Sequence, residues 1–297
     1  MDKREARLEA GGQAGLWNGG AGHAWVEEQE LVDRMFGPIE DLLLGAVAPG
    51  QALRALDVGC GTGGTTLALA RRLGPGARCT GIDISAPMVE AARRRAANAG
   101  AGLDFVCADA ARHAFVPGSI DLVVSRFGVM FFDDPAAAFA MLRRAARAGG
   151  ELRFVAWRGA GENAFMTAAE RAARPLLPDL PRRAPDEAGQ FGLAREARVR
   201  DVLAQAGWEH VGCVPVDLPC AFPEAELDGY LARMGPVGRA LETAGGALRE
   251  RVLARVRTAF DPWVAAGAVR FTAACWLVTA RAPAGAQRAG SCAAGAG

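Results

Sequence analysis

The segment that most constrains the fold is LDVGCGTGG, residues 56–64. An apolar run that contains one acidic residue leads into a glycine-rich turn, and an alanine- and leucine-rich helical pattern begins near Thr65. Glycine allows a tight turn and lets a ligand lie against the backbone without meeting a Cβ atom. The first N–H groups of the helix point toward whatever occupies the turn. The segment therefore predicts a site for a nucleotide-type ligand at the carboxyl end of a first strand.

The glycine pattern by itself is also compatible with a dinucleotide-dependent oxidoreductase. Gly59, Gly61 and Gly64 satisfy the G-x-G-x-x-G pattern, and Asp83 follows about 20 residues later. In a chain with 38 glycines, this match has low specificity. The single tyrosine, Tyr230, is followed by arginine rather than lysine three residues later. The acid–base pair of the short-chain reductases is therefore missing, which weakens this alternative.

Three successive predicted strands each carry an acidic residue at the carboxyl end. Asp57 ends the first strand, Asp83 ends the second (residues 79–84), and Asp109 ends the third (residues 103–110). Ligands of open α/β sheets bind at this edge, where the strand order reverses. Three carboxylates there suit a ligand with an amine, a ribose diol and an adenine amino group. S-adenosylmethionine has all three.

Taken together, these segments resemble the class I S-adenosylmethionine-dependent methyltransferases, over roughly residues 14–282. The branch of the ubiquinone and menaquinone C-methyltransferases and many small-molecule methyltransferases is the most similar. One departure is Ala148, where the family usually has proline in an R-P-G-G turn. The matching segments, in the family's order and spacing, are LDVGCGTGGTT (56–66), GIDISAPMVEAARRRA (81–96), FVCADA (105–110), DLVVSRFGVMFFDDP (121–135) and LRRAARAGGELRFVAWR (142–158).

The resemblance implies roles for the three carboxylates. Asp57 would orient the methionine ammonium, directly or through water, and Asp83 would accept both ribose hydroxyls. Asp109 would accept from the adenine amino group. The alternative for Asp57 and Asp109 is an ordinary turn carboxylate. The other residues expected at the cofactor are Trp17 on an N-terminal cap, Gly59, Cys60 and Gly61 in the turn, Ile84 and Met88 on the adenine faces, Ala110 at a ring nitrogen, and Ser125, Arg126 and Phe127 beneath the sulfonium.

No catalytic residue is assigned from the sequence. A sulfonium is already an activated methyl donor, so proximity and alignment supply much of the acceleration. An acidic acceptor needs a base, whereas an amine acceptor does not always need one. His23 on the cap is the best candidate for a base, although a lone histidine more often packs or caps.

Composition excludes several other classes. The hydrophobic fraction of 51%, the charged fraction of 23% and the net charge of +1 are ordinary for a globular protein and predict no nucleic-acid partner. The histidines and cysteines show no zinc-ligand spacing, so no metal is expected. The charged N-terminus lacks the apolar region of a signal peptide, and no apolar run approaches the ~20 residues of a spanning helix. We expect a cytoplasmic protein with no membrane contact, and its oligomeric state stays open.

The expected fold is α/β, a doubly wound, mostly parallel, seven-stranded Rossmann-like sheet with helical cap and lid insertions. The resemblance assigns residues 268–281 as a seventh, antiparallel edge strand. The expected division is an N-terminal arm and helical cap (1–46), a cofactor-binding core (47–158), a lid insertion (159–194), a core helix and strand (195–219), a helical cap insertion (220–262), a final core strand (263–282) and a disordered tail (283–297).

The sequence thus predicts methyl transfer to a small, largely apolar or aromatic molecule, such as a quinone, a phenol or another secondary metabolite. It does not choose between C-, O- and N-methylation. Two alternatives remain: a catalytically silent regulatory protein that binds S-adenosylmethionine, and the dinucleotide oxidoreductase. The acceptor is expected between the cap (14–46), residues 128–132 and the insertions, with an apolar wall drawn from Phe165, Met166, Phe222, Tyr230, Met234 and Trp263, unless these form the insertions' own core.

Overall fold

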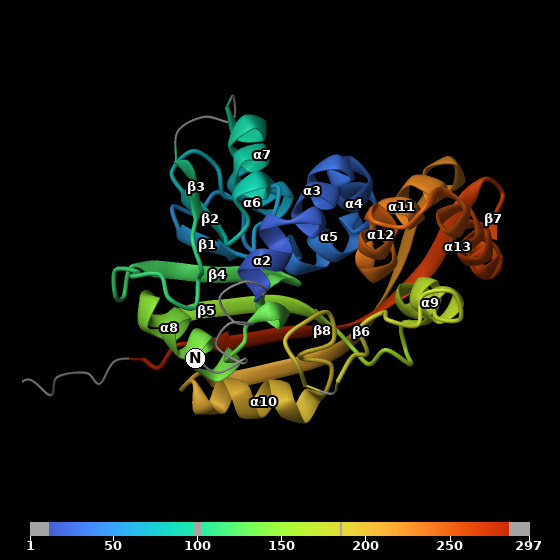
Figure 1. Ribbon diagram of the computed structural model, residues 1–297. Coiled ribbons are helices and arrows are strands. Elements are labelled where there is room, and N and C mark those ends of the chain that lie inside the picture. Colours follow the sequence, from blue (N-terminus) through green and yellow to red (C-terminus); the bar gives the residue numbers. More distant parts are fainter. Residues whose placement is uncertain (1–11, 98–101, 185, 285–297) are drawn as a thin grey trace, which may run out of the picture.

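A computed structural model describes residues 12–97, 102–184 and 186–284. Residues 1–11 of the predicted N-terminal arm and residues 285–297 of the disordered tail predicted at 283–297 lie outside the described residues. One sheet dominates the structure, with the strand order β3-β2-β1-β4-β5-β8-β6 and a short β7 paired to β8 (Figure 1). Within the described ranges, no helix is both long and apolar enough to span a bilayer.

The first five strands are parallel, as predicted from their apolar runs, because helices cover both faces of such a sheet. Asp134 begins one of these crossover helices by accepting a hydrogen bond from the Ala137 N–H at 3.0 Å. The strands are β1 (Arg54–Val58), β2 (Arg78–Asp83), β3 (Leu103–Cys107), β4 (Ile120–Arg126) and β5 (Ala146–Trp157), and the crossover helices are α6 (Gly64–Leu73), α7 (Ala86–Ala96) and α8 (Pro135–Ala145).

The antiparallel half corrects one expectation. β8 (Ala268–Arg281) does not lie at the edge: it pairs with β5 on one side and with β6 (Glu209–Pro223) on the other. The edge strand is β6, and α10 (Glu196–Gln205) precedes it. Proline cannot donate a ladder hydrogen bond, so strands rich in proline belong at sheet edges. β6 contains three prolines and β8 contains none, which is the physical reason for the observed order.

Four short helices form the N-terminal cap: α2 (Gln13–Asn18), α3 (Gly20–Glu27), α4 (Gln29–Met35) and α5 (Gly37–Gly45). Figure 1 shows them, in blue, between α7 and the orange helices. Asn18 fastens α2 to the start of α7, because its side chain donates to the Ile84 carbonyl at 3.0 Å and accepts from the Ala86 N–H at 2.8 Å. The Ser85 hydroxyl donates to the Trp17 carbonyl at 2.6 Å. The cap is therefore bound to the edge of the sheet where β2 ends.

Three helices inserted between β6 and β8 lie beside the cap: α11 (Leu227–Arg233), α12 (Gly235–Glu242) and α13 (Gly246–Ala259). Buried Glu28 in the cap forms an ion pair with Arg233, and Arg34 forms one with Glu226. The strand preceding this insertion extends to Pro223, four residues beyond the predicted boundary at 219.

Most of the residues expected in an acceptor wall form the core of the insertions. Phe165, on α9 (Ala164–Ala173), stacks on Phe271 of β8, with ring centroids 3.9 Å apart. Its edges contact Phe260 and Trp263, at 5.0 and 5.5 Å. These rings cover one another and hold α9 and α13 on the extended end of β8. They therefore do not form an exposed surface against which an acceptor could pack.

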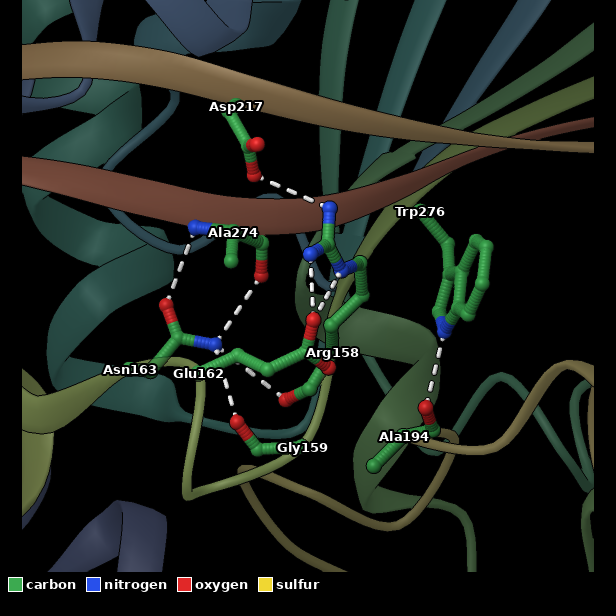
Figure 2. A network of polar contacts seen from close by, with 8 residues as sticks. All are labelled: Arg158, Gly159, Glu162, Asn163, Ala194, Asp217, Ala274 and Trp276. Carbon is green, nitrogen blue, oxygen red and sulfur yellow. Dashed lines mark hydrogen bonds and ion pairs between the residues drawn. The ribbon is translucent and has the colours of Figure 1, made fainter.

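Both ends of the segment 159–194 are fastened to β8 (Figure 2). Near its start, the buried Asn163 side chain pairs with Ala274 as another strand residue would, accepting from its N–H and donating to its C=O, each at 3.0 Å. The same amide donates to the Arg158 carbonyl at 3.2 Å. At the far end, the Trp276 indole N–H donates to the Ala194 carbonyl at 2.8 Å. The segment is thus anchored at both ends.

Candidate active site

The glycine turn after β1 fits tightly against the turn after β4. Gly59 has a φ of +69°, and a Cβ atom there would lie 2.5 Å from Gly128 Cα. Gly63, at φ +84°, is the residue before α6 and takes the left-handed conformation that glycine adopts most readily. The close approach to Gly128 and the positive φ angles explain why glycine occupies these positions. The first turn of α6 faces the space beside Asp57.

Asp83, the last residue of β2, holds this turn in place. Its carboxylate accepts hydrogen bonds from the Gly61 N–H at 2.8 Å and from the Ser85 N–H at 2.9 Å. Burial raises the pKa of Asp83, and the backbone hydrogen bonds oppose that rise. Met88 is buried beside Gly61, with its Sδ 3.7 Å from where a Cβ on that glycine would be. The structure thus brings Asp83, Gly61 and Met88 together, and all three are among the residues expected at the cofactor.

Asp57 is completely enclosed. One carboxylate oxygen, Oδ2, accepts a hydrogen bond from the Thr66 hydroxyl at 2.6 Å. The other, Oδ1, has no hydrogen-bond partner among the described residues. Burial raises the pKa of Asp57 to about 7, although the Thr66 hydrogen bond and the charge of Arg126 lower it. The negative charges of Glu40 and Asp83 raise it further.

Arg126, the last residue of β4, is the second buried charge of the site. Its side chain is 11% exposed and forms ion pairs with two cap residues, Asp33 at 3.2 Å and Glu40 at 3.8 Å. Atom Nη1 makes no hydrogen bond to any residue that the structure describes. The same holds for the buried hydroxyl of Thr65, on the first turn of α6. A buried donor without a partner costs about 1–3 kcal/mol, so two of them indicate a purpose other than stability.

These three orphaned groups line one cavity. Asp57, Thr65 and Arg126 share its wall with Trp25 and Phe36 of the cap, and the volume is about 30 Å³. The cavity offers one anionic acceptor and two donors beside aromatic rings. This is the donor set that an α-amino acid group needs, because its ammonium requires an acceptor and its carboxylate requires donors. Aromatic faces also attract a nearby cation such as a sulfonium. The residues therefore fit the methionine end of S-adenosylmethionine.

Other predicted residues have structural partners. The Ser125 hydroxyl donates to the Val58 carbonyl at 2.7 Å and accepts from the Val129 N–H at 3.2 Å, so it joins β4 to β1. Phe127 lines the cavity, at the unusual φ of +70°, and its ring stacks on Trp157 at 4.5 Å. Trp157 is not among the residues that the sequence predicts at the site.

The residues expected at the adenine lie outside the cavity. Asp109 accepts from the Ala111 N–H at 2.8 Å and lies 3.6 Å from Arg112, which is the turn role weighed as its alternative. Ala110 is buried in the hydrophobic core, Ile84 is partly buried, and Cys60 is buried among apolar side chains. Burial raises the pKa of the Cys60 thiol, so this cysteine does not provide a thiolate at neutral pH.

The two cap tryptophans and His23 take different positions relative to the cavity. Trp17 does not line the cavity; it packs edge-on against Phe131 at 5.0 Å and against Trp25 at 6.1 Å. Trp25 lines the cavity instead. His23 is exposed, with Nδ1 3.0 Å from the Gly19 carbonyl oxygen, and it is not among the cavity residues.

Comparisons with known proteins agree with this geometry. A family model for the methyltransferase domain matches residues 56–154. Nocamycin O-methyltransferase of Saccharothrix syringae is 32% identical over 207 residues, which are 64% of this chain and 71% of that protein. The chain belongs to the class I S-adenosylmethionine-dependent methyltransferases. S-adenosylmethionine is therefore its methyl donor, and the oxidoreductase and silent-regulator alternatives give way to an enzyme that transfers methyl groups.

Solved structures show the same fold. An S-adenosylmethionine-dependent methyltransferase from Aquifex aeolicus superposes with a TM-score of 0.52 at 14% identity, over 86% of this chain and 96% of that one. The cyclase SpnF superposes with a TM-score of 0.54 at 20% identity, over 89% and 96%. At such identities the likeness concerns the fold alone, and the acceptor of this methyltransferase must be argued from its own residues.

Sequence reasoning misses three polar residues of this methyltransferase's site. Thr65 is predicted only as a helix start, although a hydroxyl in the first turn after a ligand-binding loop is well placed for an anion. Asp33 and Glu40 are absent from the predicted site. They lie seven residues apart on consecutive cap helices, each next to a second charged residue (Arg34 and Asp41), so no local signal separates them from an ordinary solvated helix face.

Proposed function

We propose that this methyltransferase methylates a small, largely apolar or aromatic molecule. The observation that carries the proposal is that Trp25, Phe36 and Phe127 line the cavity beside the polar groups assigned to the methionine end, so an acceptor that approaches the methyl group meets aromatic rings. Burying apolar acceptor surface against these rings is favourable, whereas a highly charged acceptor would lose hydration without compensation. The similarity to a protein named as an O-methyltransferase of nocamycin supports a small acceptor.

For the cofactor we propose the following placement. Asp57 Oδ1 accepts from the methionine ammonium, and Asp83 accepts from the ribose hydroxyls while it holds the Gly61 N–H. Met88 and Ile84 pack on the adenine, and Asp109 and the Ala110 N–H lie at its polar edge. S-adenosylmethionine, when bound, supplies a methyl group already activated by the sulfonium. The contribution of the protein is then to align donor and acceptor and to exclude water.

The acceptor side is proposed to lie between the cap and the segment after β4. The short 3-10 helix Gly128–Phe131 follows Phe127 directly, and Phe131 contacts the cap through Trp17. No histidine lines the cavity within the described residues, so we propose that positioning rather than a strong base drives the reaction. Within this class an amine needs little basic assistance once aligned, whereas a phenol or a quinol ring carbon must also lose a proton, either to solvent or to a base outside this cavity. The division of the chain into cap, core, lid and helical insertion is proposed with the boundaries given above.

A labelled-methyl panel tests the acceptor class. Purified protein is incubated with methyl-labelled S-adenosylmethionine and separate sets of phenols, quinones, amines and carboxylic acids, and extracted products are counted and identified by mass spectrometry. We expect label in an apolar aromatic acceptor and much less label with Asp83→Ala at a limiting cofactor concentration, because that change removes the ribose acceptor. Asp201→Asn, an exposed change on α10, is the matched control and should keep full activity. Label found only in transfer RNA or protein would refute the small-molecule acceptor.

A further inference from the structure

We propose that Arg126, assisted by Thr65, binds the carboxylate of the cofactor's methionine moiety and thereby selects ligands that carry it. This assignment rests on the cofactor placement proposed above and concerns the opposite end of the amino acid from Asp57. It makes Arg126 a specificity-determining residue of the cofactor site rather than a surface charge or a contact of the sulfonium.

The first support is the geometry of the orphaned groups. An ammonium and a carboxylate on one carbon atom must be met by an acceptor and donors in close proximity. Asp57 Oδ1 provides the acceptor, and Arg126 Nη1 and the Thr65 hydroxyl provide the donors, all lining one cavity of about 30 Å³. The three atoms are buried and lack hydrogen-bond partners among the described residues. In the reverse orientation the carboxylate would face Asp57 and the ammonium would face Arg126, so like charges would meet at both ends.

The second support comes from α6. Thr65 is its second residue, and the first N–H groups of a helix carry a partial positive charge toward its N-terminus. The neighbouring hydroxyl, that of Thr66, already donates to Asp57. The Thr65 hydroxyl thus remains available on the same turn. A carboxylate between this turn and Arg126 would meet donors on two sides, which is the usual surrounding of a bound anion.

The third support is the way in which the cap fixes Arg126. Asp33 of α4 accepts from Nη2 at 3.2 Å, and it also accepts from Arg95 of α7 at 2.6 Å. Arg95 in turn donates to the Thr62 carbonyl of the glycine turn at 2.9 Å. Glu40 forms a longer ion pair with the same guanidinium, with its carboxylate 3.8 Å from Nη1 and thus beyond hydrogen-bond distance. These contacts orient the guanidinium while Nη1 keeps its hydrogen-bonding capacity for a ligand. The cap thus contributes to recognition of the carboxylate by positioning its donor.

The test compares two ligands that differ only in this carboxylate: S-adenosylmethionine and its decarboxylated form, which keeps the amine and the sulfonium. Isothermal titration calorimetry measures both affinities for the wild-type protein, Arg126→Gln and Thr65→Val. A charge-assisted hydrogen bond to a buried group corresponds to about a 10- to 100-fold affinity ratio. We expect the wild type to show that preference for the carboxylated ligand. Arg126→Gln should reduce it to less than about threefold, with the affinity for the decarboxylated ligand little changed.

One further variant, Asp83→Asn, and the already included Thr65→Val make the outcome decisive. Asp83→Asn should weaken both ligands equally and leave the ratio intact, because it acts on the ribose. Thr65→Val preserves shape and breaks no observed hydrogen bond, so it should fold even if Arg126→Gln does not, and should lower the ratio by about three- to tenfold. An unchanged ratio in Thr65→Val and Arg126→Gln, an equal loss for both ligands in Arg126→Gln, or a wild type without preference would overturn the proposal. None of these readouts involves an acceptor, so they are independent of the labelled-methyl panel.

Discussion

Replacing Asp57 with asparagine should stabilise the cofactor-free protein at neutral and alkaline pH. The carboxyl is buried and its pKa is raised to about 7, against 3.8 for the unperturbed group. Between these two values, the folded protein keeps a proton that the unfolded chain has already lost. Stability therefore falls as pH rises through this window, which is the reverse of the usual behaviour of an aspartate in a salt bridge.

The magnitude follows from the size of the pKa change. A tenfold change in proton affinity is worth about 1.4 kcal/mol, so moving the Asp57 pKa from 3.8 to about 7 costs the folded state about 4 kcal/mol above neutral pH. Most of this cost, roughly 2.5 kcal/mol, develops between pH 5 and pH 8. Asparagine has the same shape, can still accept from Thr66 and does not ionise. Its advantage over Asp57 should therefore grow by roughly 2.5 kcal/mol across that range.

Urea denaturation followed by tryptophan fluorescence at pH 5, 6, 7 and 8 measures this difference. Urea is preferred to guanidinium because it does not screen charges. Asp201→Asn on α10 is exposed and serves as a matched control whose difference from the wild type should not vary with pH. A difference between Asp57→Asn and the wild type that stays constant from pH 5 to pH 8 would refute the reasoning. So would a variant that is less stable than the wild type at pH 8.

Three other predictions follow from the same geometry. Asp83→Ala should weaken binding of S-adenosylhomocysteine by roughly 1.5–3 kcal/mol, because a charge-assisted acceptor is lost; calorimetry giving an unchanged affinity would contradict its ribose role. Cofactor binding should release about 0.9 proton at pH 6 and about half a proton at pH 7, because the ammonium favours ionised Asp57; titrations in buffers of different ionisation enthalpy measure this, and Asp57→Asn should abolish it. Gly128→Ala should destabilise the fold by about 3 kcal/mol, since a Cβ there would lie 2.5 Å from the Val58 carbonyl oxygen, whereas Gly246→Ala, with open space around it, should be nearly neutral in the same urea assay.

The parallel half of the sheet can be predicted because its signals are local. A strand buried on both faces is a continuous apolar run, and the glycines and prolines that follow it mark its end. The third strand begins at Leu103 as predicted, although it ends at Cys107 and not at 110, and α8 begins directly after Asp134, which caps it. Parallel strands end at the same sheet edge, so the sequence alone is enough to expect Asp57 and Asp83 at one site.

Strand order carries a weaker local signal. Residues 268–281 form a strand as predicted, but its place between β5 and β6 depends on which partners each edge can accept. Residues 209–223 hold prolines at 215, 219 and 223, none of which has an N–H to donate to a neighbouring strand. That pattern is present in the sequence and indicates an edge strand, so the wrong edge assignment comes from the family resemblance and not from the hydrogen-bonding capacity of the two segments.

The site itself can be predicted only in part, because its cap depends on contacts far apart in the chain. Arg126 at the end of a strand has the same local sequence whether it faces solvent or a ligand. What decides is Asp33, 93 positions earlier, which pairs with it. Trp17 and Trp25 are separated by the break between α2 and α3 at Gly19, and such a break resets the helical phase. Which tryptophan faces the cavity therefore cannot be derived from periodicity.

The polar arrangement of the cavity is explained by the ligand rather than by the fold. Asp57 and Arg126 are buried charges of opposite sign that line one cavity, yet each keeps an atom without a hydrogen bond among the described residues. A core selected for stability alone would pair them or replace them with apolar side chains, since burial of a charge is costly. A zwitterion satisfies both atoms at once, because its ammonium and its carboxylate enter together. The unsatisfied groups lower the stability of the free protein, but they make its site selective. A ligand that lacks either charge leaves one buried group unsatisfied and binds less tightly.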